Sequence, residues 1–343
     1  MGLSTGVVTT ARLTHATPAT TYAHTPERDW EADSNLPEDA PKRGCRDIAR
    51  QLIEFSHGDG LEVALGGGRR NFFPENTPDP EGDGKTGLRK DGRDLTREWL
   101  HKYGNAAYVW NEQQFKNIDV RKTDHLLGLF EHGHMEFDSD RLTDVAGEPA
   151  LADMTETAIR ILQKNKNGYF LMVEAGRIDH GHHKGIAYKA LHDGIALNKA
   201  VEKAVSMTDI SDTLIIVTAD HSHTFVIAGY PTRGNPILGK VITNDAFGNP
   251  NHTPFLAPDG KPMTTLGYYV TPGANHDGER QDITTVDTEH KDYVQQAAIP
   301  AKSGHHGGED VAIYAQGPHA ESIHGVMEQN KIYDVIKKAL KFK

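Results

Sequence analysis

Short apolar runs alternate with helix-like segments along most of this chain, and that alternation constrains its fold more than any other feature. Short apolar runs are typical of strands buried on both faces, and a helix between two such strands lets them run parallel. The sequence therefore predicts an α/β fold with a mostly parallel central sheet flanked by helices on both faces. The expected strands are residues 7–13, 61–65, 124–130, 169–173, 214–218 and 311–315, the last of them a core strand, and the expected helices are residues 17–24, 46–55, 95–103, 154–162, 187–207 and 332–342.

Two stretches, about 74–120 and 225–300, are too rich in loop-forming residues to belong to the sheet itself. We expect them to be insertions that build a rim over the functional face, because long loops in compact domains usually carry function. The chain contains no internal repeat and no low-complexity tail. We therefore expect a single domain over residues 1–343.

Composition excludes several classes of protein. The 37 Lys and Arg against 48 Asp and Glu give a net charge of −11, which argues against binding to nucleic acid or to an anionic membrane. No window approaches the length of a membrane span. The single cysteine, Cys45, excludes an internal disulfide framework and a cysteine-rich zinc module. Conversely, 20 histidines and 34 glycines suggest metal ligands on tight loops.

The densest group of candidate ligands follows the expected strand at 169–173. Glu174 ends that strand, Asp179 comes five residues later, and three histidines stand at 180, 182 and 183. Sites in open α/β sheets form beyond the carboxyl ends of the strands. Asp179 and His183 are four residues apart, so one helical turn would aim both at a single ion. An exposed polar loop with incidental histidines is the alternative, and the density of histidines favours the metal site.

Two further groups stand beside expected strands. Asp220 and His221 end the apolar run at 214–218, where an aspartate alone would more often cap a helix. His305 and His306 precede two glycines and the run at 311–315, and one of them could simply pack. Mixed carboxylate and imidazole ligands favour zinc, and carboxylate with hydroxyl and water favours magnesium. The residues by themselves predict a multinuclear metallohydrolase and leave its substrate open.

The motifs VEAGRIDHGHH, TADHSHT and HHGGED together resemble those of the alkaline phosphatases, most closely the animal-like bacterial members. The stretches STGVVTTARLTHATPA and LGGGRRNFFP match the same family, so the resemblance covers nearly the whole chain. It implies that family's α/β fold and hydrolysis of phosphoric monoesters with two zinc ions and one magnesium ion. It also implies a homodimer for the intact protein and a periplasmic or extracellular location.

The resemblance assigns the metal ligands by position. It implies a first zinc site of Asp179, His183 and His306, where His306 is favoured over His305 by its place before Gly307. The second zinc site would hold Asp220 and His221, and the magnesium site Thr17 and Glu174.

The resemblance also assigns residues to phosphate. Arg28 falls on the family's phosphate-clamping arginine, and a guanidinium fork suits two phosphate oxygens. His180 stands at the position where the family has a residue that helps to bind phosphate through water. His15 stands at the position of a family residue that lies near the magnesium ion. Without the resemblance, Arg28 reads as a solvated loop arginine.

The family's serine nucleophile and the aspartate that bridges two of its metals have no counterpart that we identify here. We expect the first family strand to be missing and the N-terminus to carry neither a signal peptide nor a myristoylation motif. The chain alone is then expected to be impaired and poorly stable. The alternatives are a non-catalytic remnant that binds zinc and phosphate, and a related hydrolase of diesters or sulfates.

Overall fold

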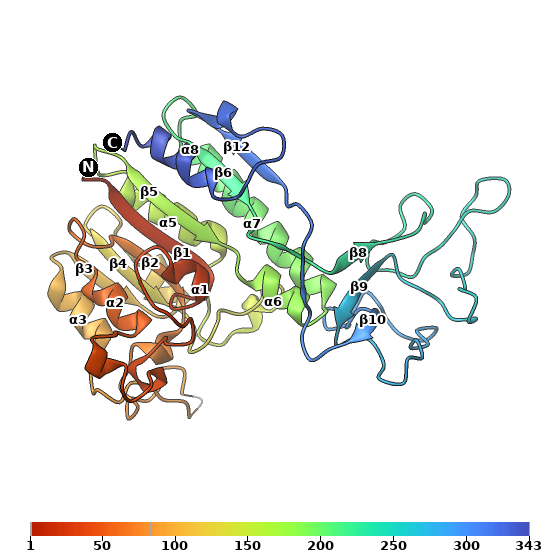
Figure 1. Cartoon of the computed structure of the whole chain (residues 1–343), viewed down its shortest axis with the longest axis horizontal. Helices are drawn as coiled ribbons and strands as arrows, with labels where there is room; N and C mark the ends of the chain where they lie inside the picture. The colour runs from red at the N-terminus through yellow and green to blue at the C-terminus, as the bar shows by residue number, and fades with distance from the viewer. Residues whose placement is uncertain (1, 83, 343) are drawn as a thin grey trace. The chain divides into compact units, whose positions relative to one another are not determined.

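The computed structural model describes residues 2–82 and 84–342, which divide into two compact units (Figure 1). The first unit comprises Met1–Arg177 and Asp193–Met207, and the second comprises Ile178–His192 and Thr208–Lys343. Within the described ranges, every helix is too short or too polar to cross a bilayer. The expectation of a single domain stays a prediction.

A five-stranded parallel sheet forms the centre of the first unit (Figure 1). Its order is β3-β4-β2-β1-β5, and β1, β2 and β4 are buried along nearly their whole length. Each successive parallel pair is joined by a crossover, as a parallel sheet requires. The predicted α/β class is confirmed. The strands are β1 (Ser4–Arg12), β2 (Val63–Gly67), β3 (Ala106–Val109), β4 (His125–Leu129) and β5 (Tyr169–Glu174).

Helices cover both faces of this sheet. Val7 belongs to one buried cluster with Leu52 of α2 and Trp99 of α3. Its neighbour Val8 belongs to a second cluster with Met154 of α5. Successive strand residues point to opposite faces, so β1 is packed from both sides. The helices are α1 (Ala16–Ala19), α2 (Ile48–Glu54), α3 (Leu95–Lys102), α4 (Glu112–Lys116), α5 (Leu151–Leu162) and α7 (Ala187–Met207), whose part from Asp193 on belongs to this unit.

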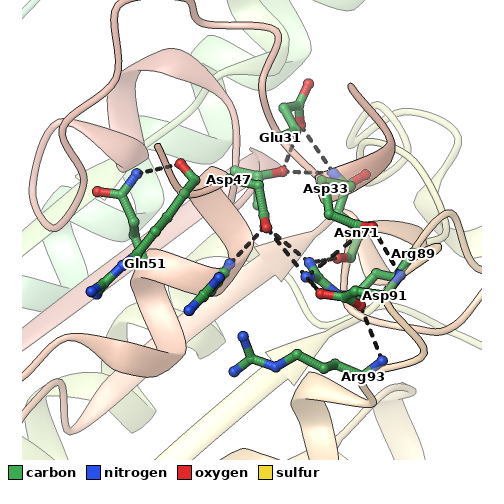
Figure 2. A network of polar contacts seen from close by, with 12 residues as sticks. Glu31, Asp33, Asp47, Gln51, Asn71, Arg89, Asp91 and Arg93 are labelled. Atoms are coloured by element: carbon green, nitrogen blue, oxygen red, sulfur yellow. Dashed lines mark hydrogen bonds and ion pairs between the residues drawn. The ribbon is translucent and has the colours of Figure 1, made fainter. Parts of the chain in front are cut away.

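A buried ionic network fixes the loops beside α2 (Figure 2). Asp47 caps α2 by accepting a hydrogen bond from the backbone N–H of Arg50 (2.8 Å). The same carboxylate receives both terminal nitrogens of Arg89 (2.9 and 3.2 Å), whose side chain is completely buried. Asp91 binds the other side of Arg89. A buried guanidinium needs this full set of partners, so the network holds the 89–91 loop against the helix.

The second unit contains small sheets. β9 (Leu266–Thr271) pairs with parallel β10 (Ala297–Pro300) and antiparallel β8 (Phe225–Ile227). Two antiparallel pairs stand apart from that sheet, β6 with β12 and β7 with β11. The remaining elements are α6 (Arg177–His183), which enters this unit at Ile178, β6 (Ile215–Thr218), β7 (Ser222–His223), β11 (His306–Gly307), β12 (Ile313–Gln316) and α8 (Lys331–Ala339).

The structure corrects two of the expected strands. Residues 214–218 and 311–315 are expected to be strands, the latter in the core, but the structure pairs β6 and β12 with each other and outside the five-stranded sheet. Tyr314 of β12 is 69% exposed. An apolar run indicates a strand without indicating its partner, which depends on contacts distant in sequence. The strand β3 was missed, because it lies within the stretch assigned to an insertion.

The helix expected over residues 17–24 is also wrong in its length, because α1 ends at Ala19. Thr20 and Thr21 follow, and their hydroxyls donate to the carbonyls of Thr17 and Pro18 (2.7 Å each). Such local side-chain bonds compete with continuation of a helix. The other expected helices are present within a few residues of their predicted ends.

Candidate metal centre

Asp179 and His183 lie one turn apart on α6, in the second unit. The Nε2 atom of His183 is 3.3 Å from Oδ2 of Asp179. Nδ1 of His183 donates to the carbonyl oxygen of Gly304 at 2.7 Å, since a carbonyl can only accept. In the neutral ring this bond keeps the proton on Nδ1, so Nε2, the nitrogen beside Asp179, is the atom that could bind a metal.

Glycines allow the backbone to come this close to α6. A Cβ atom on Gly304 would lie 2.5 Å from the carbonyl oxygen of His182. A Cβ atom on Gly181 would lie 2.7 Å from the backbone nitrogen of Ala190, at the start of α7. Both distances are too short for any real side chain, so these two positions require glycine.

The β7–β11 pair brings two more histidines to the same point. His306 is paired with His223 in this antiparallel ladder. Nε2 of His306 is 3.5 Å from Oδ1 of Asp179 and 3.3 Å from Nε2 of His183. The candidate ligand atoms of Asp179, His183, His223 and His306 all lie within 4.8 Å of one another. His305 stands outside this group and is exposed.

The spacing of these atoms fits a tetrahedral zinc ion. Ligands at about 2.0–2.1 Å from zinc lie about 3.3 Å from one another in a tetrahedron. The two Nε2 atoms of His183 and His306 are 3.3 Å apart, and each lies near one oxygen of Asp179, His183 at 3.3 Å from Oδ2 and His306 at 3.5 Å from Oδ1. One carboxylate and two imidazoles are also a donor set typical of zinc. These three residues could therefore hold one zinc ion with a fourth position open.

His223 is closer to Asp179 and plays a different part. Its Nε2 atom is 2.7 Å from Oδ1 of Asp179, which is a hydrogen-bond distance. Its ring is buried and is stacked with that of His182, whose Nδ1 is 2.7 Å from the hydroxyl of Tyr268. Sequence reasoning alone does not single out His223. The available signal was the period-two pattern His221-Ser222-His223, which places both histidines on one side of a strand.

The electrostatic surroundings of these groups favour the protonation states in which such side chains bind a metal. Burial would raise the pKa of Asp179, but hydrogen bonds and charge from His183 and His223 hold it well below its usual range. Burial, together with the charge of His223, lowers the pKa of His182 to about 4. Burial and the charge of His221 also lower the pKa of His306. An ionised aspartate and neutral imidazoles are the species that bind zinc.

The expected second zinc pair lies beside the first group. Nε2 of His221 is 3.3 Å from Oδ2 of Asp220, and the His221 ring stacks on that of His306 with centroids 3.6 Å apart. Among the residues that the structure describes, no third His, Cys, Asp or Glu joins this pair at the spacing of a shared ion. Asp220 is largely exposed.

Of the residues expected at magnesium and phosphate, Glu174, Thr17, Arg28 and His15 lie in the first unit and His180 lies in the second. Oε2 of Glu174, at the end of β5, accepts a hydrogen bond from Oγ1 of Thr9 (2.5 Å). Thr17 is exposed in α1, which contacts β5. Nη2 of Arg28 is 3.1 Å from Nε2 of His15. In the second unit, His180 is half-buried on α6 between the two ligand positions.

A second group of candidate ligands lies in the first unit and was not predicted. The carboxylates of Glu81, Glu131 and Asp144 lie within 4.8 Å of one another. Burial and the charge of Glu81 raise the pKa of Glu131 to about 7. An all-oxygen group of this kind could hold a hard cation such as calcium. Its members are separated by up to 63 residues and share no motif, so local sequence contains no signal for this group.

Known proteins match the chain along its length. The family model for alkaline phosphatase matches residues 1–342. The chain is 44% identical over 338 residues to the alkaline phosphatase of Gadus morhua, and 46% identical over 338 residues to the tissue-nonspecific alkaline phosphatase of Gallus gallus. These alignments cover 96% of this chain but only 68% of the first relative and 62% of the second.

Solved structures agree in fold. The alkaline phosphatase of Thermus thermophilus matches with a TM-score of 0.65 at 24% identity, covering 100% of this chain and 72% of that one. The enzyme from the Antarctic bacterium TAB5 matches with a TM-score of 0.61 at 20% identity, covering 100% and 73%. The resemblance inferred from the motifs is confirmed. The chain belongs to the alkaline phosphatase family.

Proposed function

We propose that this chain carries the metal-binding and phosphate-binding part of a phosphomonoesterase of the alkaline phosphatase type. The observation that carries the proposal is the convergence of Asp179, His183 and His306 at the spacing of a zinc coordination sphere. Family membership supplies the reaction class. The proposed further sites are a second zinc ion at Asp220 and His221 and a magnesium ion at Thr17 and Glu174.

The chain's own residues have distinct parts in this proposal. Bound zinc would supply Lewis acidity toward phosphoryl oxygens. Arg28 would bind two phosphate oxygens with its fork, and His15, 3.1 Å from that guanidinium, would position it. His223 would orient the Asp179 carboxylate through their 2.7 Å contact. His180 would contribute to phosphate binding through water.

The alternative is a chain that binds zinc and phosphate without turnover. It is favoured by one observation from the sequence, since no serine stands in the context of the family's nucleophile. Ser222 lies between two histidines and donates its hydroxyl to Glu309. The absence of a nucleophile and of the bridging aspartate stays a prediction.

Hydrolysis of p-nitrophenyl phosphate at alkaline pH, with zinc and magnesium supplied, tests the proposal. Bound zinc is measured on the same samples, and His306→Ala is compared with His305→Ala as its neighbour outside the cluster. We expect zinc binding that is lost in His306→Ala and kept in His305→Ala. A hydrolysis rate that rises and falls with the amount of bound zinc supports the phosphomonoesterase. Bound zinc without hydrolysis supports the non-catalytic alternative. Zinc binding that is equal in both variants would contradict the proposed centre. Faster turnover of a diester or a sulfate would reassign the substrate.

A further inference from the structure

The LGGGRRNFFP motif contains two adjacent arginines with opposite environments. Arg69 is completely buried and binds Asp79 through two nitrogens (2.8 and 3.0 Å), with Glu81 as a further partner. Arg70 is half-buried, and among the described residues its guanidinium makes no hydrogen bond or ion pair. Its Nε atom is shielded from solvent without a partner. The ion pairs of Arg69 therefore offset the cost of burying its charge, whereas Arg70 has no such partner among the described residues.

The glycines of the same motif leave room for other basic groups to lie close to it. A Cβ atom on Gly68 would lie 3.0 Å from Cβ of Arg12, so the Arg12 side chain lies against that glycine. A Cβ atom on Gly67 would lie 2.4 Å from the carbonyl oxygen of Gly133, so the loop that carries His134 lies against this one. The motif thus assembles the ends of β1 and β2 and the loop after β4 at close range.

Positive charge exceeds negative charge at this place. Arg12 forms a two-pronged ion pair with Glu31, through Nε at 2.7 Å and Nη2 at 2.5 Å. Oε2 of Glu31 also accepts from Thr14 and Asn71, so this carboxylate is shared among several donors. Burial, together with the charge of Arg12, lowers the pKa of Arg70. The charge of Glu31 acts in the opposite direction, but that carboxylate is already paired with Arg12, so the partly desolvated Arg70 has no carboxylate of its own, which is costly unless an anion binds there.

A line of contacts joins this place to the proposed phosphate clamp within the first unit. Arg28 lies 3.1 Å from His15, whose ring meets that of His134 edge-on with centroids 5.1 Å apart. His134 in turn contacts Arg12 through its Nε2 and Nη1 atoms. Arg70 thus stands at the far end of a run of basic groups that starts at Arg28.

We propose that Arg70, with Arg12 beside it, forms an accessory anion site that binds a second, non-reacting acidic group of the phosphate ester held at Arg28. The class of ligand is a phosphate ester whose leaving group carries its own phosphate or carboxylate several bonds away. A group joined directly to the first phosphate would not reach past the two intervening histidine rings. The inference rests on the proposed function, because it takes Arg28 as the clamp for the first phosphate.

Two phosphonates that resist hydrolysis test this by titration calorimetry. Hexane-1,6-diphosphonate carries two acidic groups on a flexible linker, and hexylphosphonate carries one. Both compounds offer one phosphonate to any bound metal. The difference between their affinities therefore measures the contribution of the second phosphonate. We expect Arg70→Ala to weaken diphosphonate binding about tenfold, as loss of one charge-assisted contact implies, and to leave hexylphosphonate unchanged. Arg70→Lys should retain part of the preference, and Arg121→Ala, at an arginine whose side chain is 87% exposed, should change neither ligand.

The outcomes separate this inference from the function it rests on. Equal affinity of the unmodified chain for both ligands, or equal weakening of both by Arg70→Ala, would overturn the accessory site. Arg28→Ala should weaken both ligands. If it weakens neither while Arg70→Ala still removes the preference, the clamp is wrong and the Arg70 site stands alone. A structural role for Arg70 would lower the melting temperature of Arg70→Ala, whereas relief of an unbalanced charge should maintain or raise it.

Discussion

The Nε2 atom of His223 lies 2.7 Å from Oδ1 of Asp179, although 44 residues separate them in the chain. The carboxylate of Asp179 meets His183 and His306 at longer distances of 3.3 and 3.5 Å. The short contact fits a hydrogen bond, and the longer ones, made by Oδ2 and Oδ1 respectively, place both imidazoles beside the carboxylate where one ion could be shared. Asp179 therefore contacts a histidine from each strand of the β7–β11 pair and from its own helix α6.

Replacement of His223 is expected to weaken zinc binding without removing a ligand. His223→Ala frees the Asp179 carboxylate to rotate, and loss of such an orienting partner typically costs 10- to 100-fold in metal affinity. Competition with a zinc chelator measures this, with His252→Ala at an exposed histidine of the same unit as the control. Complete loss of zinc, as expected for His306→Ala, would make His223 a ligand instead.

Gly181 and Gly194 give a matched pair of glycine substitutions. Gly181→Ala places a methyl group 2.7 Å from the backbone nitrogen of Ala190, so α6 must shift, at a cost of about 1–3 kcal/mol in unfolding free energy. Gly194 lies inside α7 with open space at its Cβ position, so Gly194→Ala should stabilise by about 0.5–1 kcal/mol. Chemical denaturation measures both. A neutral Gly181→Ala would mean that α6 has room to move.

Much of this architecture could be predicted from local sequence, and the exceptions share one cause. Periodicity located α5 and α7, and apolar runs located β1, β2, β4 and β5. The pairing of β6 with β12 and the membership of β3 in the sheet depend on distant contacts, which local patterns do not encode.

The residues of the candidate site also fall into those that local sequence indicates and those that only the folded chain brings together. Candidate ligands crowded into one motif, such as Asp179 and His183, share one helix face, which their spacing indicates. His223 lies in the motif TADHSHT, but its contact with Asp179 depends on how β7 and β11 are placed in the folded chain. Glu81, Glu131 and Asp144 come together only in the folded chain.

Calcium is expected to stabilise the first unit through Glu131. Burial and the charge of Glu81 raise the pKa of Glu131 to about 7, so carboxylates crowd there at neutral pH and a divalent cation would relieve their repulsion. Calcium should raise the melting temperature of the chain, more at pH 8 than at pH 6, because protons compete for the same oxygens. Glu131→Gln should abolish the effect, and Glu38→Gln, at a 95% exposed side chain, should not. An unchanged calcium effect in Glu131→Gln would assign it to another site.

Asp193 is expected to make the chain less stable as pH rises toward 7. It is completely buried at the start of the first unit's part of α7, and burial raises its pKa to about 7, with the nearby charges of Asp138 and Asp140 adding to the effect. Because the folded chain holds this proton more tightly than the unfolded chain, stability falls between the ordinary pKa of about 4 and the raised value. Asp193→Asn keeps the acceptor for the backbone N–H of Asp138 and cannot ionise. The variant should melt at a higher temperature than the unmodified chain at pH 8, and the difference should shrink progressively as the pH is lowered to about 4. A difference that does not change with pH would mean that Asp193 stays ionised when buried, balanced by the adjacent guanidinium of Arg177.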